Sequence, residues 1–595
     1  MEKLFIIFML LCSTGFTNVF YVDVNNPKAD DKNSGSKNSP WKTLKKAGET
    51  AKAGDTVIVK EGIYREVLEV KNSGTSEKPI IFKTEGKVII TGADIVKGWE
   101  KLEDKRPIWV KRNWKYKIWK RGEEWKWRAE QVIVDDNLYE QVFSLKDMKP
   151  GSFFWDETGE SLYIWITPKP GHPFIEPFNL PWWETPVNFY SDNPNERRIE
   201  ASIRSVCIKV ENKENIIISG FHIRYCANQA QFGAISVSGK NITIENCLVE
   251  FTNGVGITFV GENLIIRNNV SRYNGEAGAG SGQSKNLLFE GNTLLRNNYK
   301  GHSHGWEGGG IKICKSEKAI IRGNKFIENN GPGLWLDWGN REFIIEKNIS
   351  VRNIGSGIMI EVSPETPDDY KGPFKPGIIR NNICAFNRFD GTWGSGILLQ
   401  LASYTYVLHN TVYGNEQFGI FLRYHPYANY GGGKDKKENV GYIHTVRNNV
   451  VMYNIVANNK GGQIYITPDP YDKPGAVKDN ICDYNLFWDE ENWNFIEDAT
   501  KKRLWASMES WSKWGKIETM GTYSVEERFK ITGYDENSFQ WDPKFVSPDT
   551  LDFRILPGSF AIGAAKPHPF VEDDFYGNPR PKDRNTTMGA IEFIQ

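Results

Sequence analysis

GPGLWLDWGN (331–340) and GSGIMIEVSP (355–364) are successive copies of one glycine-led phrase, and this phrase decides the fold. After the glycine, apolar residues alternate with variable ones, as they do along a β-strand. Related phrases stand at GGIKICK (309–315), GSGILLQL (394–401) and FGIFLRYH (418–425). A strand-forming phrase that recurs along a chain predicts a solenoid of stacked coils.

A second pattern, an apolar triplet followed by asparagine, recurs along the chain together with the first. Its asparagines are 23, 23, 32, 24 and 34 residues apart by subtraction of their numbers: Asn246, Asn269, Asn292, Asn324, Asn348 and Asn382. A period near 23 residues, lengthened by loop insertions, predicts short parallel strands that meet at tight corners. Asparagine at a corner suits a left-handed backbone conformation and can form a ladder of side chains.

The composition limits the partners. Lys plus Arg equals Asp plus Glu, 74 each among 595 residues, so the chain has no general electrostatic attraction for nucleic acid or for an anionic membrane. Aromatic residues make up 13% of the chain and include 21 Trp, and flat amphipathic rings suit the faces of sugars. About half of these tryptophans are expected to fill domain junctions instead, because aromatic residues also dominate cores. The expected partner is a carbohydrate.

The first residues predict export. MEKLFIIFMLLCSTGFTN (1–18) has the composition of a signal peptide and is too short to span a bilayer. Cys12 raises the alternative of a lipid anchor, but Leu11 stands where such signals carry a small residue, so cleavage and release are expected. The product would be secreted or periplasmic, without a membrane attachment. The six other cysteines form no CxxC pair, so neither a metal site nor a cofactor is predicted, and a disulfide stays open.

The period divides the chain into segments. Residues 93–195 interrupt it with a stretch rich in Trp and Lys and with alternating strands, which predicts an inserted β domain. A helix is expected at 499–515, and 552–566 reads as a last coil. The predicted parts are a signal peptide (1–18), an N-terminal cap with the first coils (19–92), the inserted domain (93–195), the parallel β-helix core with the active site (196–483) and a C-terminal coil and closure (484–595).

One outward column of side chains carries the candidate chemistry. The fourth place after the glycine of each phrase holds Cys314, Asp337, Glu361, Gln400 and Arg423. Asp337 and Glu361 are 24 residues apart by subtraction, or one coil, which predicts carboxyl groups close to the ~5–5.5 Å of retaining glycosidases. Two like charges so close resist joint ionisation, so one group should donate a proton while the other attacks.

Several phrases resemble a known family. The start AGDTVIVKEGIYRE (53–66) resembles the starts of secreted right-handed parallel β-helix proteins, and WEGGGIKI (306–313), GLWLDW (333–338) and IEVS (360–363) resemble glycoside hydrolase family 120, the β-helical β-xylosidases. The resemblance implies Asp337 as the nucleophile and Glu361 as the acid/base, with Glu307 and Lys312 in the substrate pocket. After IEVS the family continues with His-Gly, where this chain has Pro364 and Glu365.

The second place after each glycine forms a mostly apolar outward column that needs a cover. The inserted domain would pack on it, or sugar rings would stack on Trp335 and on Trp338 nearby. Packing is the expected role of Met359 and Leu398. Arg423 would hold a substrate hydroxyl or carboxylate, or would neutralise the acidic column. His302 and His304 are expected to be ordinary loop residues, because a metal site needs a complete ligand set.

The predicted fold is all-β: a right-handed parallel β-helix with an inserted β domain and a capped C-terminal region. The predicted function is a secreted glycoside hydrolase that acts on plant-type oligo- or polysaccharides, xylo-oligosaccharides first, by a retaining double displacement. Two alternatives are a polysaccharide lyase or uronate epimerase, in which Lys312 or Arg423 would serve, and a non-catalytic carbohydrate-binding surface protein. Linkage, exo or endo action and oligomeric state stay open.

Overall fold

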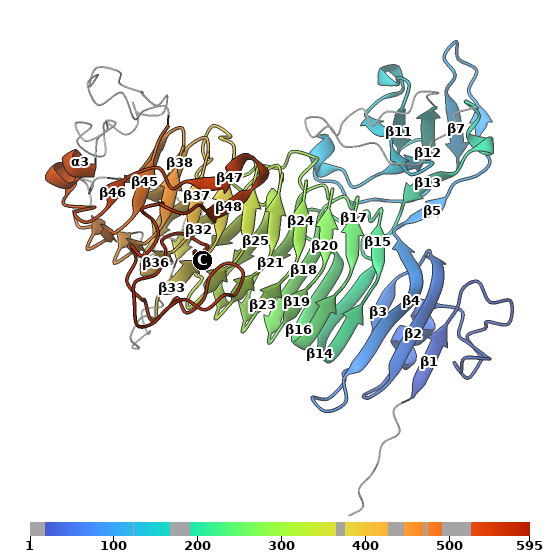
Figure 1. Ribbon diagram of the computed structural model, residues 1–595. Helices are drawn as coiled ribbons and strands as arrows, with labels where there is room; N and C mark the ends of the chain where they lie inside the picture. The colour runs from blue at the N-terminus through green and yellow to red at the C-terminus, as the bar shows by residue number, and fades with distance from the viewer. Residues whose placement is uncertain are drawn as a thin grey trace, which may run out of the picture.

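The described chain is a long parallel β-helix with one domain projecting near its N-terminal end (Figure 1). The computed structural model describes residues 18–122, 124–166, 191–363, 375–425, 445–467, 469, 474–490 and 525–594. Residues 1–17 of the predicted signal peptide and the helix expected at 499–515 lie outside the described residues. The all-β class and the parallel solenoid that the repeated phrases predict are confirmed.

Each coil contributes strands to three parallel faces. The first face, which carries the glycine-led phrases, consists of β18 (Val255–Glu262), β21 (Ala277–Ser281), β25 (Gly309–Cys314), β29 (Leu334–Asp337), β32 (Ile358–Ser363), β35 (Ile397–Ala402), β38 (Phe418–Arg423) and β42 (Gly462–Ile466). The second consists of β19 (Ile265–Arg267), β23 (Leu288–Glu290), β27 (Ile320–Arg322), β30 (Ile344–Glu346), β33 (Gly377–Arg380), β36 (Thr405–Leu408), β40 (Val450–Met452) and β44 (Ile481–Asp483).

The third face consists of β15 (His222–Arg224), β17 (Leu248–Glu250), β20 (Val270–Arg272), β24 (Thr293–Leu295), β28 (Lys325–Ile327), β31 (Ile349–Val351), β34 (Ile383–Ala385), β37 (Thr411–Tyr413), β41 (Ile455–Ala457) and β45 (Leu486–Trp488). Two long strands, β14 (Ile208–Ser219) and β16 (Gly233–Glu245), turn through a corner and serve two faces. Short pairs stand at the corners: β22 (Ser284–Lys285) with β26 (Ser316–Glu317), and β39 (Val446–Arg447) with β43 (Val477–Lys478).

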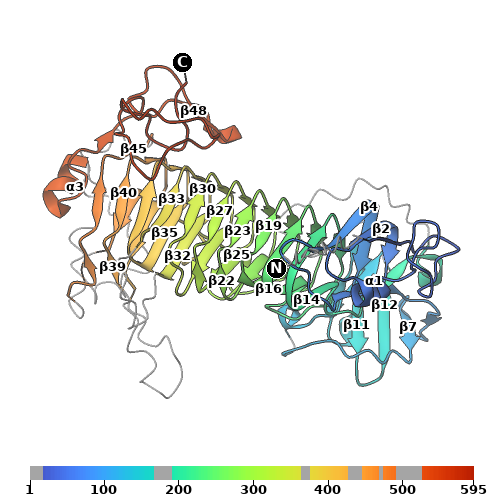
Figure 2. The same ribbon diagram turned by 90° about the horizontal axis from the view of Figure 1, so that it is seen from below.

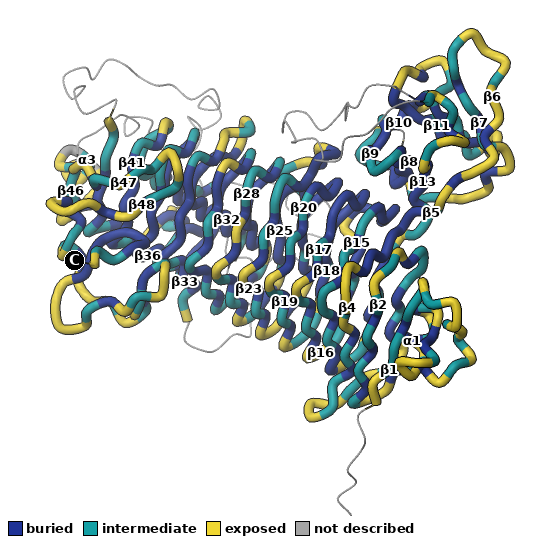
Figure 3. The backbone as a smooth tube through the Cα atoms, turned by 45° about the vertical axis from the view of Figure 1, so that its right-hand side comes forward, coloured by how far each residue is buried: buried dark blue, intermediate teal, exposed yellow. Residues whose placement is uncertain are grey.

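The interior of the coils is a continuous apolar column. Leu336 is aligned with Ile313 on one neighbouring coil and with Ile360 on the other, and all three are fully buried. In Figure 3 the buried backbone runs along the whole solenoid, with exposed positions mainly at corners and in the end structures. The apolar residues of each phrase therefore point inward, and the column that holds Asp337 points outward.

Asparagine ladders run along the corners between the faces. Asn269, Asn292, Asn324 and Asn348 each donate from Nδ2 to Oδ1 of the asparagine on the next coil, over 2.9–3.1 Å. The predicted ladder is confirmed, but Asn246 lies outside it, because Asn269 accepts from the backbone N–H of Cys247.

The left-handed conformation belongs to the residue before each ladder asparagine and not to the ladder asparagine itself. Asn268 (φ 54°), Lys347 (φ 57°) and Asn381 (φ 54°) occupy this position, and Asn246 (φ 56°) occupies the equivalent one before Cys247. The corner thus needs two residues, one that turns the backbone and one that points its amide into the stack.

The glycines that lead the phrases have a steric cause. A Cβ on Gly310, Gly333, Gly357, Gly396 or Gly419 would come within 2.2–2.8 Å of a carbonyl oxygen on the following coil. Real Cβ atoms do not approach an oxygen that closely, so only glycine lets the coils stack at this corner. The strands that carry Asp337 and Glu361 begin directly after these contacts, and their register is fixed there.

The N-terminal cap closes one end of the stack. It contains β1 (Val19–Val22), α1 (Leu44–Thr50), β2 (Thr56–Tyr64), β3 (Leu68–Val70) and β4 (Ile80–Thr91). Thr43 caps α1 by accepting from the N–H of Lys46, and Leu44 and Ala47 bury one face of the helix against the first strands. The helix thereby covers apolar surface that the first coil would otherwise expose.

The chain leaves the coils at Gly92 and returns at Ile203, whose N–H donates to the Gly92 carbonyl. Between them, one sheet contains β5 (Ala93–Ile95), β8 (Val132–Val134), β9 (Asn137–Leu138) and β13 (Ile199–Ser202), and the other contains β6 (Glu100–Lys101), β7 (Trp109–Arg112), β10 (Glu140–Val142), β11 (Ser152–Asp156) and β12 (Ser161–Trp165). Three 3-10 turns are η1 (Trp125–Trp127), η2 (Leu145–Asp147) and η3 (Pro194–Glu196). The domain extends to 202, beyond the predicted 195, because β13 pairs with β5.

A buried lysine ties the inserted domain to the coils. Nζ of Lys300 donates to the Arg128 carbonyl over 2.5 Å and also to Oδ1 of Asn253. Burial lowers the pKa of Lys300 to about 7. Trp127 lies 5.2 Å from both His302 and Trp306, measured between ring centroids. The inserted domain therefore contacts the loop that leads into β25.

The C-terminal segment lies along one side of the later coils (Figure 2). After β46 (Phe539–Gln540), which pairs with β45, the segment forms an antiparallel pair, β47 (Phe545–Ser547) and β48 (Asp552–Ile555), with η5 (Pro548–Thr550) between them. The helix α3 (Val525–Thr532) precedes it. The last coil expected at 552–566 is wrong, because β48 pairs with β47 alone among the described strands and its Phe553 packs on the outside of β31 and β34.

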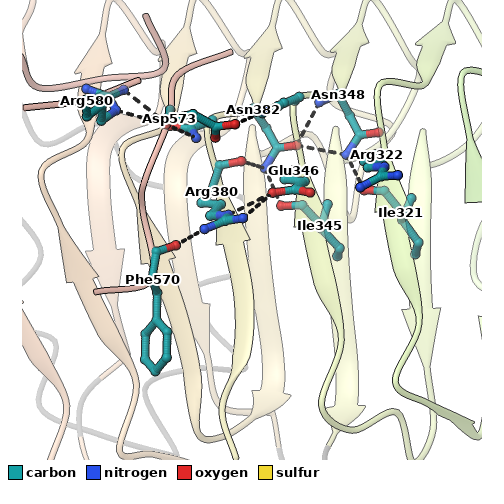
Figure 4. A network of polar contacts seen from close by, with 12 residues as sticks. Ile321, Arg322, Ile345, Glu346, Asn348, Arg380, Asn382, Phe570, Asp573 and Arg580 are labelled. Atoms are coloured by element: carbon teal, nitrogen blue, oxygen red, sulfur yellow. Dashed lines mark hydrogen bonds and ion pairs between the residues drawn. The ribbon is translucent and has the colours of Figure 1, made fainter. Parts of the chain in front are cut away.

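Polar contacts hold this segment in place (Figure 4). Arg380 on β33 pairs with Glu346 on the preceding coil over 2.5 Å and also donates to the Phe570 carbonyl. Nδ2 of Asn381 donates to the Asp573 carbonyl over 2.8 Å. These partners are about 190 residues apart in the chain, as the separations of 190 and 192 show.

Candidate active site

The predicted outward column stands in register on five successive strands. Cys314, Asp337, Glu361, Gln400 and Arg423 are aligned pair by pair along β25, β29, β32, β35 and β38. Asp337 and Glu361 are therefore direct neighbours, with backbones one strand spacing apart, or ~4.8 Å. Asp337 is 8% exposed and Glu361 is 1% exposed, so the two carboxyl groups are not solvated surface charges.

Lys312 joins Asp337 to Glu307. Its Nζ lies 3.0 Å from Oδ2 of Asp337 and 3.5 Å from Oε1 of Glu307, and it donates to the Trp306 carbonyl over 2.6 Å. Burial opposes a charge on Lys312, but the two carboxylates outweigh burial, and the pKa of Lys312 is raised. Burial also raises the pKa of Glu307, against the lowering effect of Lys312. Lys312 is therefore a fixed cation beside Asp337.

Glu361 is held from the following coil. Nε2 of Gln400 donates to Oε1 of Glu361 over 2.6 Å, and Oε1 of Gln400 accepts from Nε1 of Trp393 over 3.4 Å. The backbone N–H of Trp393 donates in turn to Oδ1 of Asp390 over 2.6 Å. One chain of contacts thus runs from the 386–396 loop to Glu361.

Trp335 is outward but covered. It is 2% exposed and belongs to an apolar cluster with Met359, Trp393, Leu398, Phe418 and Phe421. Nζ of Lys312 lies 4.0 Å from the centroid of its ring. None of the described residues of the inserted domain belongs to this cluster, so its cover comes from the 386–396 loop and β38. The packing role predicted for Met359 and Leu398 is confirmed, since both are fully buried.

Trp338 and Arg423 flank the column. Trp338, directly after Asp337, has φ 50° at the corner and is 40% exposed, with Nζ of Lys315 4.8 Å from the centroid of its ring. Arg423 is half-buried at the other end of the column, and its guanidinium lies 5.9 Å from the ring of Phe421. Of the two tryptophans proposed to meet a sugar, Trp338 therefore has the accessible ring.

The loop before β25 forms one rim of the site. Nδ1 of His304 bonds to Oδ2 of Asp390 over 2.8 Å and its Nε2 to Oδ1 of Asn330 over 2.9 Å, so this residue links two loops. His302 packs against both Trp127 and Trp306, and burial lowers its pKa to about 3. Within the described part of the chain, no group of three or more His, Cys, Asp or Glu residues could hold a metal ion.

A third carboxyl group, which the sequence did not single out, lies behind this rim. Glu276 is fully buried just before β21, and its Oε2 accepts from the backbone N–H of Gln231 over 2.7 Å. Burial raises its pKa to about 8, and the charge of Glu307 adds to the rise. Nε2 of Gln231 donates to Oε1 of Glu307 over 3.0 Å, so one glutamine contacts both glutamates.

Glu276 is not part of a recognisable apolar strand phrase in the sequence. Its coil reads GEAGAGSG (275–282), and small residues there hide the alternation that marks the neighbouring strands. One feature of the sequence does point to Glu276: it is an acid at the same corner as Glu307, one coil earlier, since Ala277 is aligned with Gly309.

Comparisons with known proteins agree on the fold. Residues 204–305 and 233–367 match the family model described as a right handed beta helix region, and residues 38–111 match the Chondroitinase B model. Among curated proteins, the uncharacterized protein YwoF of Bacillus subtilis (strain 168) is 44% identical over 72 residues. The match covers 12% of this chain and 15% of YwoF, so it spans only a small part of that relative.

Among solved structures, XylC in complex with xylose superposes with a TM-score of 0.62 at 16% identity, over 97% of this chain and 98% of XylC. A double mutant of the periplasmic alginate epimerase AlgG gives a TM-score of 0.38 at 15% identity, over 73% of this chain and 78% of that one. The right-handed parallel β-helix is confirmed by the family model and by XylC, and the predicted resemblance holds at the level of the fold. No helix among the described residues combines the length and the apolar character needed to cross a membrane.

Proposed function

We propose that the protein is a glycoside hydrolase that cleaves plant-type oligo- or polysaccharides with retention of anomeric configuration. The observation that carries the proposal is the alignment of Asp337 with Glu361 on adjacent strands of one outward column. Backbones one strand spacing apart, ~4.8 Å, favour the short carboxyl separation of a retaining enzyme, whereas an inverting enzyme separates its pair to admit water. Like-charged acids directly opposite one another destabilise a sheet, so a purely structural role is a poor explanation.

The surroundings of the two acids favour unequal roles. Asp337 is ion-paired with Lys312 over 3.0 Å, which suits a group that must attack as a carboxylate. Glu361 is bound by the neutral amide of Gln400, which accommodates either protonation state of a group that first donates and then accepts a proton. We therefore assign Asp337 as the nucleophile and Glu361 as the acid/base, as the family 120 resemblance implies.

The remaining residues position the substrate. Glu307, held by Lys312 and Gln231, lies at the rim, where its carboxylate can accept bonds from sugar hydroxyls. Trp338 offers a partly exposed ring for stacking, and Arg423 stands at the far end of the column. Trp335 supports Lys312 from below, so its proposed contribution is indirect, through the orientation of that lysine.

The lyase or epimerase alternative needs a base near C5 of a uronate. Lys312 fits that role poorly, because the carboxylates of Asp337 and Glu307 raise its pKa and keep it protonated. A surface protein without activity would not need two adjoining buried acids with separate partners. Hydrolysis is thus the chemistry that these contacts favour.

The test is the stereochemistry of the first product. Aryl β-xylosides and xylo-oligosaccharides would be incubated with the mature protein, and proton NMR would follow the anomeric signals before mutarotation. A retaining enzyme releases the β-anomer first. First release of the α-anomer would overturn the double displacement, and an unsaturated product that absorbs in the ultraviolet would favour a lyase.

A further inference from the structure

A groove crosses six successive coils at the corner that follows the acidic column. Its volume is about 640 Å³, and its walls come from the same corner position in each coil: Asn212, 238–240, 260–262, 283–285, 315–317, and Gly339 with Arg341. The groove lies beside the candidate active site along the chain, because its lining residue Lys315 follows Cys314 and its lining residue Gly339 stands two residues after Asp337.

Most charges of the groove are matched within it. Lys240, Glu262, Lys285, Glu317 and Arg341 alternate in sign and are aligned from coil to coil. Lys240 lies 3.5 Å from Glu262, and Arg341 lies 2.9 Å from Glu317. The structural explanation, a self-neutralising ladder, therefore accounts for these five residues, although it leaves one positive charge in excess.

Lys315 stands outside this ladder. It lines the groove next to Cys314, and among the described residues it forms no salt bridge with a carboxylate. Its Nζ lies 4.8 Å from the centroid of Trp338, whose ring is 40% exposed. An ammonium group beside an accessible indole, at the end of a groove with excess positive charge, fits a sugar that carries a carboxylate.

The coil before Lys315 leaves room for a sugar chain beside this pair. On the coil before Lys312 and Cys314 the aligned positions are Gly280 and Gly282, where an added Cβ would meet no atom closer than 3.8 Å. A sugar chain can therefore pass close to the backbone there without meeting a side chain.

We propose that this groove binds a substrate chain that continues from the cleaved bond and carries a uronic acid, whose carboxylate pairs with Lys315 while a sugar ring stacks on Trp338. The inference rests on the proposed glycosidase function. It goes beyond that function by naming an acidic glycan as the substrate class and Lys315 as a specificity-determining residue.

The experiment compares two probes, xylotriose and xylotriose substituted with glucuronic acid. The ratio of their kcat/KM values would be measured for the wild type, Lys315→Ala, Lys315→Arg and Lys325→Ala, where Lys325 is an exposed lysine on β28 outside the groove. A partly exposed ion pair contributes up to about 1 kcal/mol, so the wild type should prefer the acidic probe by about fivefold at low salt. Lys315→Ala should bring the ratio close to one, Lys315→Arg should retain part of the preference, and Lys325→Ala should behave like the wild type.

Titration calorimetry with both probes separates the two proposals. If neither probe is hydrolysed but the wild type binds the acidic one more tightly through Lys315, the glycosidase function fails and the groove assignment stands. If neutral xylotriose is cleaved as well as the acidic probe, or if Lys315→Ala leaves the ratio unchanged, the groove assignment fails and the glycosidase function stands. Preference for a sulfated xylotriose over the uronate would overturn the carboxylate as the recognised group.

Discussion

Nε2 of Gln400 donates a 2.6 Å hydrogen bond to Oε1 of Glu361, which lies one coil earlier in the same column. Both residues are 1% exposed, so the bond is shielded from water. Because the amide and the carboxyl group occupy aligned positions on adjacent strands, the register of the β-helix itself sets their approach. The same register that brings Asp337 to one side of Glu361 brings Gln400 to the other.

Gln400→Leu should impair the proton transfer of Glu361 more than the fold. Loss of a buried hydrogen bond to this carboxyl group should cost about 1–3 kcal/mol, or roughly fivefold to 150-fold in kcat/KM. The loss should be larger on aryl glycosides with poor leaving groups, which depend on the acid. Gln417→Leu is the matched control, since Gln417 is also 1% exposed but bonds to Ser395 outside the column. Equal losses on all leaving groups would contradict this role.

Trp335→Ala and Trp335→Phe should differ mainly in stability. Truncation of a buried tryptophan to alanine costs about 3–5 kcal/mol and would leave Lys312 without its support, so the melting temperature and the activity should both fall. Trp335→Phe keeps an aromatic face beneath the ammonium and should retain most of both. An unchanged melting temperature in Trp335→Ala, with weaker substrate binding, would instead show that the ring meets a sugar directly.

Local patterns predicted the coils and the acidic column, because a parallel β-helix repeats one side-chain environment at nearly constant spacing. The sequence predicts that Asp337 and Glu361 are neighbours on adjacent coils, since each follows its glycine by four residues. Contacts between segments that are far apart in the sequence cannot be predicted from this repeat. Arg380 bonds to the Phe570 carbonyl of the C-terminal segment, and Trp393 of the 386–396 loop covers Trp335. Neither of these two segments follows the repeat of the coils.

The sequence pattern also places Asn246 in the asparagine ladder, where the structure does not have it. Asn246 and Asn269 have the same letter and nearly the same spacing, but one turns the backbone and the other points into the stack. A shift of one residue decides between these roles, and the one-letter pattern does not resolve it. The sequence pattern does not indicate Glu276 as a site residue, because glycine and alanine replace the apolar residues that would reveal the register of its coil.

Gly333→Ala should destabilise the coils next to the site. The added Cβ would lie 2.2 Å from Oγ of Ser350 and 2.8 Å from the Gly357 carbonyl oxygen, and the backbone there cannot retreat without breaking the stack. We expect a loss of at least about 1–3 kcal/mol, seen as a lower first transition in calorimetry. Gly282→Ala is the control, since its Cβ would meet only Cγ2 of Val260 at 3.9 Å. Similar melting temperatures for the two variants would refute the steric explanation.

Glu276→Gln should change how stability depends on pH. Burial raises the pKa of Glu276 from 4.5 to about 8, so the folded protein binds a proton that the unfolded chain releases. Proton binding by Glu276 should therefore add to the free energy of unfolding of the wild type, fully below pH 4.5. This stabilisation should be lost as the pH rises toward 8, by up to about 1.4 kcal/mol per pH unit. The glutamine variant lacks this titration, so its melting temperature relative to the wild type should rise between about pH 5 and pH 8. A difference that stays constant over this range would show that Glu276 is ionised in the fold.

Asp337→Asn and Glu361→Gln should fail in different ways, because the two aligned acids have different partners. Without its nucleophile, Asp337→Asn should form no glycosyl-enzyme, and a 2-fluoroglycoside inactivator that labels the wild type should leave it unlabelled in mass spectrometry. Glu361→Gln should still attack substrates with very good leaving groups, accumulate the intermediate because no base activates water, and regain rate when azide is added. Cys314→Ser, one coil before Asp337 in the column, serves as the control and should be labelled like the wild type. Labelling of Asp337→Asn, or azide rescue of that variant in place of Glu361→Gln, would reverse the assignment of the two roles.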